Sequence, residues 1–259
     1  MGKQHSRILQ TNNGLPQGST LSPELFNIML HDIPISSSIH NLLYADDCVI
    51  WKSGNDLRES SKHMQDYLNE LNEWFLSWGL RISHEKAVPM LFSHSNREEY
   101  FQISLGENIL TPRKEYKYLG VIFDTRLTWK PHIDNIVQRC KKRINILKCI
   151  AYSKFCNNVQ ELLQVYRAII RSLMDYACKA YDSALTSVKN ILNSIQYQAL
   201  LVCAGGKKGT SLRTLQVELG DMPLDFRREM FTIRLKKRID SIPNHPLEKD
   251  LQDCWQFNF

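Results

Sequence analysis

Several kinds of segment are missing from this 259-residue chain. No apolar run approaches the roughly 20 residues of a membrane helix, and the first residues carry no apolar signal-peptide core. The seven cysteines form no CxxC pair and have no zinc-finger spacing to the eight histidines, so the sequence predicts neither a disulfide framework nor a zinc site. There is no internal repeat or low-complexity segment. These absences indicate an intracellular protein with free thiols.

The chain does contain enough apolar sequence for a large core, with 43% hydrophobic and 23% charged residues. Its formal net charge of +6 is concentrated in two predicted helices. Residues 130–150 and 227–238 each carry six basic side chains against a single acidic one. Such helices are typical of nucleic-acid-binding proteins, and they are equally typical of ordinary solvated helix faces.

Two adjacent carboxylates, Asp46 and Asp47, lie between the apolar segments 42–43 and 49–51. This pattern predicts a β-hairpin over 42–51 with both acidic residues at its tip. Like charges on neighbouring residues repel, but a hard divalent cation with oxygen ligands turns that repulsion into a binding site. The alternative is a plain surface turn, because Asp favours turns, although such turns more often carry Asn-Gly or Asp-Gly.

A glycine-containing loop lies upstream, over residues 14–20. Gly14 and Gly18 allow the backbone to turn sharply and to come close to a planar ligand, and Gln17 offers both a donor and an acceptor. A base pair is such a ligand. The sequence therefore allows a nucleotide-binding loop at this position.

The same loop leads into a predicted helix over residues 21–30. We expect Ser22 to be its N-cap and Pro23 to occupy its first helical position. Pro16, Ser19 and Ser22 would serve a simple helix-capping loop equally well, which is the alternative to a ligand site.

Helical and strand-like patterns alternate further along the chain. Apolar residues at helical spacing predict a long helix from Asp56 to Trp78, which Gly79 ends. Strand character follows at Val88 to Phe92, Phe101 to Leu105 and Tyr116 to Phe123. From Pro131 onward the pattern is helical, and the change in composition at residues 129–131 predicts a domain boundary.

GLPQGSTLSPELFN at residues 14–27 is followed by LYADD at residues 43–47. Together, these segments resemble the palm of the reverse transcriptases of non-LTR (LINE-type, jockey-like) retrotransposons. The resemblance implies an α+β fold whose residues 1–128 are a partial right-hand polymerase palm, in which helices pack on an antiparallel sheet. A helical thumb over residues 129–204 and a helical C-terminal extension over residues 205–259 would follow.

In that family the acidic hairpin is the catalytic centre. The resemblance implies that Asp46 is a catalytic, metal-binding residue that ligates magnesium directly, and that Asp47 supports the same site. Two Mg²⁺ ions would serve nucleotidyl transfer, one activating the primer 3′-hydroxyl and the other neutralising the triphosphate and the departing pyrophosphate. The implied nucleotide- and template-binding residues are Gly14, Pro16, Gln17, Gly18, Ser19 and Tyr44.

Two later motifs follow in the order of that family. WGLRISHEK at residues 78–86 resembles the segment after the long palm helix, where Lys86 would be the catalytic general acid for the pyrophosphate. His84 is an alternative donor, and a lone lysine is otherwise simply solvated. KYLGV at residues 117–121 resembles the primer-grip strand, where a glycine lets the backbone approach the primer end, or it is an ordinary core strand. The implied primer-grip residues are Tyr118, Leu119 and Gly120.

The predicted helix from His132 to Ala151 resembles the thumb that follows the palm. Arg139, Lys142 and Arg143 flank its apolar stripe, which suits a helix that tracks nucleic-acid phosphates. The apolar stripe consists of Ile133, Ile136, Val137, Cys140, Ile144 and Leu147. A weaker resemblance continues to about residue 230. It includes Tyr166, Asp175, Tyr176, Leu192, Ile195, Gln196 and the segments 209–211 and 221–224.

The resemblance implies an RNA-directed DNA polymerase, a nucleotidyltransferase that takes an RNA template, a DNA primer and deoxynucleoside triphosphates. The first palm motif of this family, which carries another aspartate, would precede Gly14, yet residues 1–13 contain no Asp or Glu. We therefore expect a fragment that is inactive alone. A non-catalytic nucleic-acid-binding relic and a domesticated interaction module are the alternative interpretations.

Overall fold

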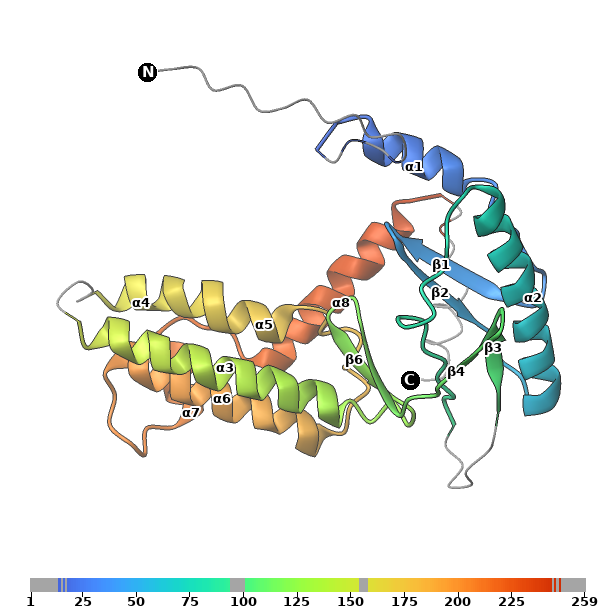
Figure 1. The fold of residues 1–259 in the computed structure, drawn as a ribbon. Helices are drawn as coiled ribbons and strands as arrows, with labels where there is room; N and C mark the ends of the chain where they lie inside the picture. Colours follow the sequence, from blue (N-terminus) through green and yellow to red (C-terminus); the bar gives the residue numbers. More distant parts are fainter. Residues whose placement is uncertain are drawn as a thin grey trace, which may run out of the picture. The chain divides into compact units, whose positions relative to one another are not determined.

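The structure is a computed structural model, and it describes residues 14, 16, 18–93, 101–153, 158–243, 245 and 247. The chain divides into two compact units (Figure 1). The N-terminal unit holds residues 1–89 and 97–112, and the C-terminal unit holds residues 90–96 and 113–259. Helices occur together with small antiparallel sheets, which agrees with the predicted mixed class. No helix within these described ranges is long and apolar enough to cross a membrane.

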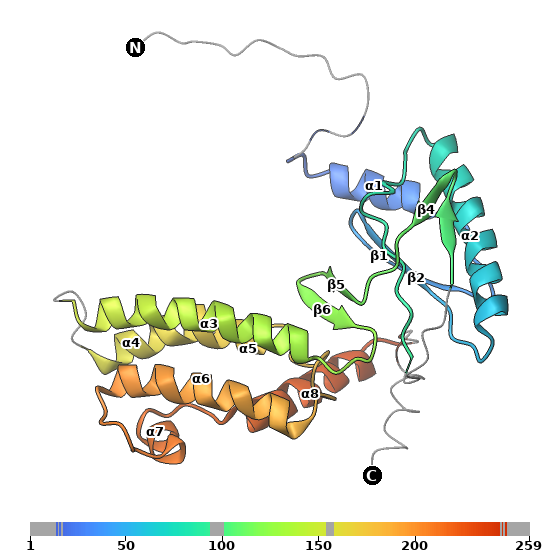
Figure 2. The same ribbon diagram turned by 60° about the horizontal axis from the view of Figure 1, so that its bottom comes forward.

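The N-terminal unit packs one long helix against two small hairpins (Figure 2). Its elements are α1 (Ser22–Leu30), β1 (His40–Tyr44), β2 (Asp47–Trp51), α2 (Leu57–Ser77), β3 (Ile103–Leu105) and β4 (Asn108–Leu110). β1 pairs antiparallel with β2, and β3 pairs antiparallel with β4. Tyr67 and Leu71 of α2 are buried with side chains of the first hairpin, whereas Leu68 is buried with the second. α2 therefore joins the two small sheets into one unit.

The long helix predicted over residues 56–78 is confirmed as α2. The Asp56 carboxylate caps its N-terminus by accepting hydrogen bonds from the backbone amides of Arg58 at 2.8 Å and Glu59 at 3.4 Å. At the other end Gly79 has φ +71°, a left-handed conformation that costs glycine little. Both ends of this helix are thus set by residues adjacent in sequence.

The helix predicted over residues 21–30 is present as α1, but the predicted N-cap is wrong. Ser22 is already helical, and Leu21 occupies the N-cap position without a side-chain hydrogen bond. The Ser22 hydroxyl instead donates to the carbonyl oxygen of Pro16 at 2.7 Å. The hydroxyl of Ser22 therefore binds the preceding loop and does not cap the backbone amides of α1. Pro23 lies in the first turn, as expected.

The strand predictions in residues 88–110 are confirmed only in part. Phe101 to Leu105 contains β3, whereas residues 88–92 form no strand. Pro89 has no amide hydrogen to donate to a β-ladder, which explains why no strand forms over residues 88–92. β4 was not predicted, because its three residues are too short to show alternation. Gly106, with φ +58°, lies in the turn between β3 and β4.

The segment from Tyr116 to Phe123 was predicted as one strand, and this prediction is wrong, because the segment forms a hairpin. β5 (Glu115–Tyr118) pairs antiparallel with β6 (Val121–Asp124). Leu119 and Gly120 connect them with φ values of +44° and +83°. A tight turn that has positive φ at both central residues reverses the chain and matches the twist of the two strands.

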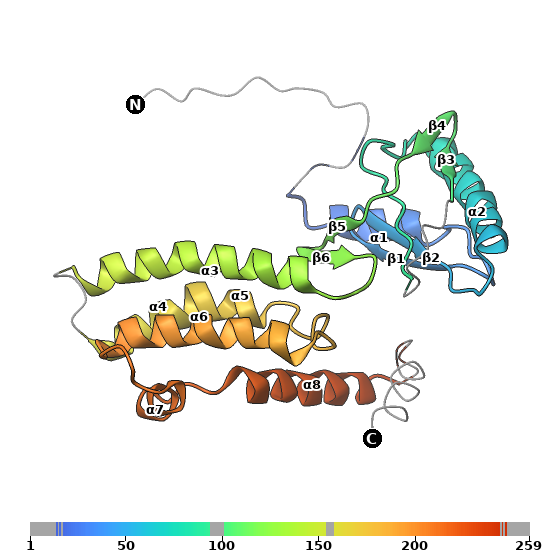
Figure 3. The same ribbon diagram turned by 90° about the horizontal axis from the view of Figure 1, so that it is seen from below.

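The C-terminal unit continues from this hairpin into a set of packed helices (Figure 3). They are α3 (Lys130–Ala151), α4 (Val159–Tyr166), the π-helix η1 (Arg167–Arg171), α5 (Ser172–Asp175), α6 (Thr186–Ala204), α7 (Leu212–Glu218) and α8 (Leu224–Asp240). The helical pattern predicted from Pro131 onward is therefore confirmed as far as Asp240, and most of the residues beyond 243 lie outside the described part of the chain. α3, α4 and α6 lie side by side and bury a common core.

α3 confirms the predicted amphipathic helix. The Asp124 carboxylate holds the turn before it by accepting hydrogen bonds from the backbone amides of Thr128 and Trp129, both at 2.9 Å. Every residue of the predicted apolar stripe is buried: Ile133, Ile136, Val137, Cys140, Ile144 and Leu147. Cys140, Cys178 and Cys203 are buried and Cys48 and Cys149 are exposed, and none of these five forms a disulfide.

Asp221 is the centre of a buried polar network in the C-terminal unit. Its carboxylate accepts hydrogen bonds from Tyr166 Oη at 3.1 Å, Gln196 Nε2 at 3.0 Å and Arg171 Nη1 at 2.5 Å. Gln216 Nε2 donates to Gln196 Oε1 at 2.8 Å. Burial, with the Asp221 charge as the second cause, raises the pKa of Tyr166 far above its ordinary value, so the phenol stays a donor. The network links α4, η1, α6 and α7 to the loop before α8.

Candidate active site and nucleic-acid interface

The two acidic residues lie at the tip of the β1–β2 hairpin, as predicted. Tyr44 pairs with Asp47 across the hairpin, which leaves Ala45 and Asp46 as the connecting turn. Ala45 has φ +52°, an uncommon conformation for a residue with a side chain. Asp46 and Asp47 are both exposed, and no other described segment buries their carboxylates. The hairpin therefore presents two negative charges to solvent on a strained turn.

The strand register explains why this tip is held in place. Alternation puts Asn41, Leu43 and Ile50 on the face of the hairpin toward α2. Asn41 Nδ2 donates to Tyr67 Oη at 2.8 Å, and Tyr67 Oη donates to the carbonyl oxygen of Pro34 at 2.7 Å. Burial is the main cause that raises the pKa of Tyr67, which keeps this phenol a donor.

The opposite face of the hairpin carries Tyr44 beside Asp47. Tyr44 is 65% exposed, and Leu42 on the same face is 54% exposed. Further along this face, His40 and Trp51 stack with their ring centroids 5.2 Å apart. The tip thus combines two carboxylates with an exposed aromatic ring, a combination suited to a charged ligand that also has a planar part.

The donor chemistry of Asp46 and Asp47 fits a divalent cation, because carboxylate oxygens are the ligands that Mg²⁺ prefers in proteins. Within the part of the chain that the structure describes, no group of three or more His, Cys, Asp or Glu side chains could hold a metal ion. The hairpin therefore offers a partial ligand set, to which substrate phosphates, water or a further carboxylate would have to be added.

The glycine-containing loop has an open backbone. Gly14 and Gly18 both have φ +92°, and a Cβ built on either one would meet no atom within 4 Å. Backbone conformation, not packing, is therefore what favours glycine at both positions. Ser19 donates its amide to the carbonyl oxygen of Pro16 at 3.2 Å, which closes the turn. Gln17, also predicted to bind nucleotide or template, lies outside the described residues.

Lys86 lies in a turn after α2, on a different element from the acidic tip. Its backbone amide donates to the carbonyl oxygen of Ser83 at 3.2 Å. His84, the alternative donor, lies in the same turn, and both side chains are exposed. The structure thus leaves both candidates for the general acid open.

The predicted primer-grip residues lie in the C-terminal unit, on the β5–β6 hairpin. Leu119 and Gly120 form its tip, and Tyr118 ends β5. The ring of Tyr176 covers Gly120, since a Cβ built on Gly120 would lie 3.1 Å from Tyr176 Cε1. Packing as well as backbone conformation therefore favours glycine here, which the sequence pattern alone did not indicate.

The three basic residues predicted on α3 differ in their surroundings. Arg139 and Lys142 are exposed. Arg143 is half-buried, and its Nη1 donates to the carbonyl oxygen of Ile169 in η1. Arg139 and Lys142 are therefore available to an anionic partner, whereas Arg143 also contributes to helix packing.

The second basic stretch, on α8, is partly structural. Arg227 binds the carboxylate of Asp175 through Nε at 2.9 Å and Nη2 at 2.5 Å. Arg228 is buried and contacts the carboxylates of Asp225 and Asp182. Beyond them the basic residues of α8 are exposed: Arg234, Lys236, Lys237 and Arg238.

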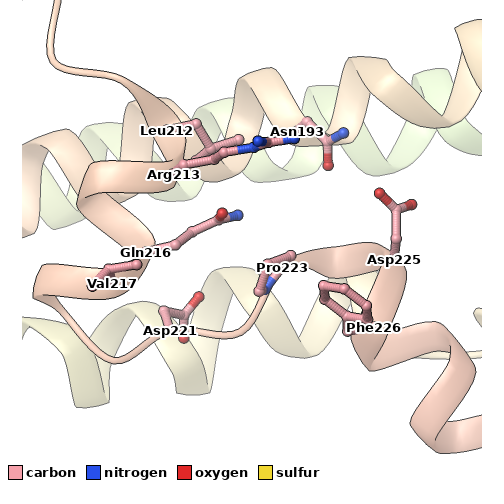
Figure 4. A pocket seen from close by; sticks show the side chains of 9 residues that line it. All are labelled: Asn193, Leu212, Arg213, Gln216, Val217, Asp221, Pro223, Asp225 and Phe226. Atoms are coloured by element: carbon pink, nitrogen blue, oxygen red, sulfur yellow. The ribbon is translucent and has the colours of Figure 1, made fainter.

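A pocket of about 680 Å³ lies beside α6, α7 and the start of α8 (Figure 4). It is lined by Asn193, Leu212, Arg213, Gln216, Val217, Asp221, Pro223, Asp225 and Phe226. None of these residues was predicted as part of a functional site. Figure 4 shows Arg213 and Asn193 on one wall, with Pro223 and Phe226 across from them.

Comparisons with known proteins match the chain to enzymes of mobile elements. The family described as reverse transcriptase (RNA-dependent DNA polymerase) matches residues 1–123. The RNA-directed DNA polymerase from mobile element jockey of Drosophila funebris is 25% identical over 239 residues, which cover 89% of this chain and 26% of that protein. The probable RNA-directed DNA polymerase from transposon BS of Drosophila melanogaster is 26% identical over 237 residues, covering 86% of this chain and 26% of that protein.

A third relative extends the match to another type of element. It is a retrovirus-related Pol polyprotein from type-1 retrotransposable element R1 of Nasonia vitripennis, 22% identical over 222 residues, which cover 82% of this chain and 66% of that protein. The chain spans about a quarter of the length of the jockey and BS proteins. No solved structure matches the chain. Residues 1–123 therefore match the reverse transcriptase family, and over most of its length the chain shows homology to RNA-directed DNA polymerases of non-LTR retrotransposons.

Proposed function

We propose that this chain provides part of the palm and the thumb of an RNA-directed DNA polymerase. The observation that carries the proposal is the exposed Asp46–Asp47 pair at a hairpin tip, within the segment that matches the reverse transcriptase family. Residues 1–128 would form the partial palm, residues 129–204 the thumb-like region and residues 205–259 a helical extension.

At the acidic tip, Asp46 would bind Mg²⁺ directly and Asp47 would support the site. When bound, two such ions supply charge stabilisation for nucleotidyl transfer from a deoxynucleoside triphosphate. The part played by the protein is to hold the carboxylates in position, which the Asn41 and Tyr67 hydrogen bonds do from the opposite face of the hairpin. Lys86 would donate the proton that the pyrophosphate takes up.

The nucleic-acid substrates would be an RNA template and a DNA primer. The open backbone at Gly14 and Gly18 would allow a base pair to approach closely. Exposed Tyr44 would contact the nucleotide beside the carboxylates. The β5–β6 tip would approach the primer end, and the exposed basic residues of α3 would contact phosphates.

The test restores the polymerase parts that the proposal requires. The fingers and first palm motif of a jockey-type enzyme are fused ahead of Gly14, and incorporation of labelled nucleotides on an RNA template is measured with and without magnesium. We expect magnesium-dependent DNA synthesis that Asp46→Asn abolishes. Asp66→Asn, which changes an exposed carboxylate on α2, is the matched control. A folded, template-binding fusion whose synthesis is unaffected by Asp46→Asn would contradict the proposal.

A non-catalytic nucleic-acid-binding function is the second candidate. It is favoured by one observation, the exposure of Arg139 and Lys142 on a helix whose apolar stripe is fully used in the core. The two candidates separate in the fusion experiment, because nucleic-acid binding without synthesis leaves only this second function.

A further inference from the structure

Tyr176 contacts the tip of the β5–β6 hairpin in two ways. Its hydroxyl donates a hydrogen bond to the carbonyl oxygen of Leu119 at 2.7 Å. Its ring lies over Gly120, so that a Cβ built there would be 3.1 Å from Cε1 and 3.5 Å from Oη. One side chain thus contacts both residues of the turn.

The turn needs such support because its backbone is strained. Leu119 has φ +44°, a left-handed conformation that is unfavourable for a residue with a side chain. A hydrogen bond to its carbonyl oxygen favours this conformation over the alternatives in which that oxygen points elsewhere. The hydroxyl of Tyr176 is therefore placed to select one geometry of the tip.

Tyr176 is itself fixed from the C-terminal helix. α5 ends at Asp175, and Tyr176 follows in an extended conformation with φ −62° and ψ +125°. The Asp175 carboxylate is held by two hydrogen bonds from Arg227 of α8, and Arg171 Nε lies 3.9 Å from the same group. The Arg227 guanidinium also lies over the ring of Phe231, 5.2 Å from its centroid. Contacts therefore run without a break from α8 through Asp175 and Tyr176 to the hairpin tip.

We propose that Tyr176 is a positioning residue, which holds the β5–β6 tip in the conformation used to contact the 3′ end of a primer. Asp175 and Arg227 set the position of Tyr176, so the C-terminal helix contributes to the primer contact without touching the primer. The inference rests on the function proposed for this hairpin.

The test compares Tyr176→Phe with the unchanged 259-residue chain. This change removes only the hydroxyl, and Tyr152→Phe, at a tyrosine that is 87% exposed at the end of α3, is the matched control. The first measurement is hydrogen exchange of the backbone amides at residues 118–121, relative to amides in the core of α6. The loss of one hydrogen bond should speed exchange at the tip about fivefold, with little change in α6.

The second measurement is affinity for an RNA–DNA duplex that has a recessed DNA 3′ end, relative to the same duplex closed by loops at both ends. We expect Tyr176→Phe to reduce the preference for the recessed end about threefold, as a displaced contact of modest strength would. A change confined to folding would weaken binding to both duplexes equally.

The outcomes distinguish the positioning role of Tyr176 from the primer contact proposed for the β5–β6 tip. Faster exchange at the tip together with a reduced preference for the recessed end supports the positioning role. Unchanged exchange at residues 118–121 overturns it, whatever the duplex affinities are. Faster exchange with an unchanged preference overturns the primer contact assigned to the hairpin, and with it the use of the Tyr176 contact in catalysis, but leaves the acidic site at Asp46 untouched.

Discussion

The two units differ in how much of their apolar sequence they bury. The C-terminal unit has a continuous core with fully buried side chains that include Leu163 and Leu192. In the N-terminal unit Leu21, Ile28 and Ile35 are 65%, 67% and 87% exposed. The C-terminal unit also exposes apolar side chains, among them Leu185 and Val217. The difference lies in the buried side chains, which form one core in the C-terminal unit and two small clusters in the N-terminal unit. The N-terminal unit, which holds most of the residues that match the reverse transcriptase family, therefore has the smaller core.

The units also differ in how they use polar groups. Asp221 in the C-terminal unit is buried among three donors, and Arg227 is held by Asp175. Asp46 and Asp47 in the N-terminal unit face solvent. Buried, fully paired charges specify packing, whereas exposed like charges on a strained turn are available for binding. The charges of Asp221, Asp175 and Arg227 thus contribute to packing in one unit, whereas those of Asp46 and Asp47 at the tip of the other are exposed, as the proposed metal site requires.

The largest expected effect concerns the acidic tip in the fusion described above. Asp46→Asn keeps the shape of the side chain but removes the charge of a metal ligand, so the rate of DNA synthesis should fall on the order of a thousandfold, or about 4 kcal/mol. Asp47→Asn should cost less, because that side chain is proposed to support the site. Single-turnover incorporation at matched template binding measures both. A larger loss for Asp47→Asn would reverse the assigned roles.

The next largest effect tests the difference in burial with one matched pair of changes. Leu163→Ala, at a fully buried position, should reduce the free energy of unfolding by about 2–5 kcal/mol, because it leaves a cavity in the core of the C-terminal unit. Leu25→Ala, at a position 48% exposed on α1, should change it by less than about 0.5 kcal/mol. Urea unfolding followed by circular dichroism gives both values. Equal losses would mean that Leu25 is covered in solution.

Sequence patterns predicted the parts of the fold that depend on neighbouring residues. α2 was predicted with both its ends because Asp56 and Gly79 act on adjacent backbone. The acidic hairpin was predicted because its flanks are apolar and the turn is short. The Ser22 hydroxyl was assigned wrongly because its partner, Pro16, lies in a loop whose conformation no pattern specifies.

Other features depend on residues far apart in sequence. Gly120 is covered by Tyr176, and Asp175 is held by Arg227, 52 positions away. No periodicity relates such residues, so the contact that fixes the hairpin tip was not predictable. For the same reason the basic residues of α8 could not be divided into paired and exposed ones before the ion pairs were known. Long-range pairing is what separates these cases from the helix ends.

A smaller effect is expected from pH, and it is confined to the C-terminal unit. His132 is buried against Tyr181, and its Nδ1 accepts a hydrogen bond from the Ile122 amide at 3.2 Å. Burial, followed by the charge of Arg139, lowers the pKa of His132. The unfolded chain therefore binds more protons, and stability that is present above a pH of about 6.5 is lost as the pH falls.

The measurement is the free energy of unfolding between about pH 7.5 and pH 5. His132→Asn keeps an acceptor for the Ile122 amide but cannot titrate, so the variant should lose part of the pH dependence of the unchanged chain. His84→Asn, at an exposed histidine, is the control. If His132→Asn has the same pH profile as the unchanged chain, this histidine does not couple protonation to folding.

The smallest effect concerns the basic face of α3 and tests whether exposed charges differ in use from buried ones. The double change Arg139→Ala and Lys142→Ala removes two exposed charges, so the slope of log affinity against log salt for a DNA duplex should fall by about two, and affinity should weaken for all sequences alike. Arg58→Ala with Lys62→Ala, on exposed positions of α2, is the matched control and should leave the slope nearly unchanged.

Arg143→Ala should behave differently from both double variants, because the Arg143 guanidinium donates a hydrogen bond to the carbonyl oxygen of Ile169. Loss of this guanidinium should reduce the free energy of unfolding by about 1 kcal/mol and change the slope of log affinity against log salt little. A slope lowered by about one, without a loss of stability, would mean that Arg143 binds phosphates. The distinction between structural and binding charges on α3 would then fail.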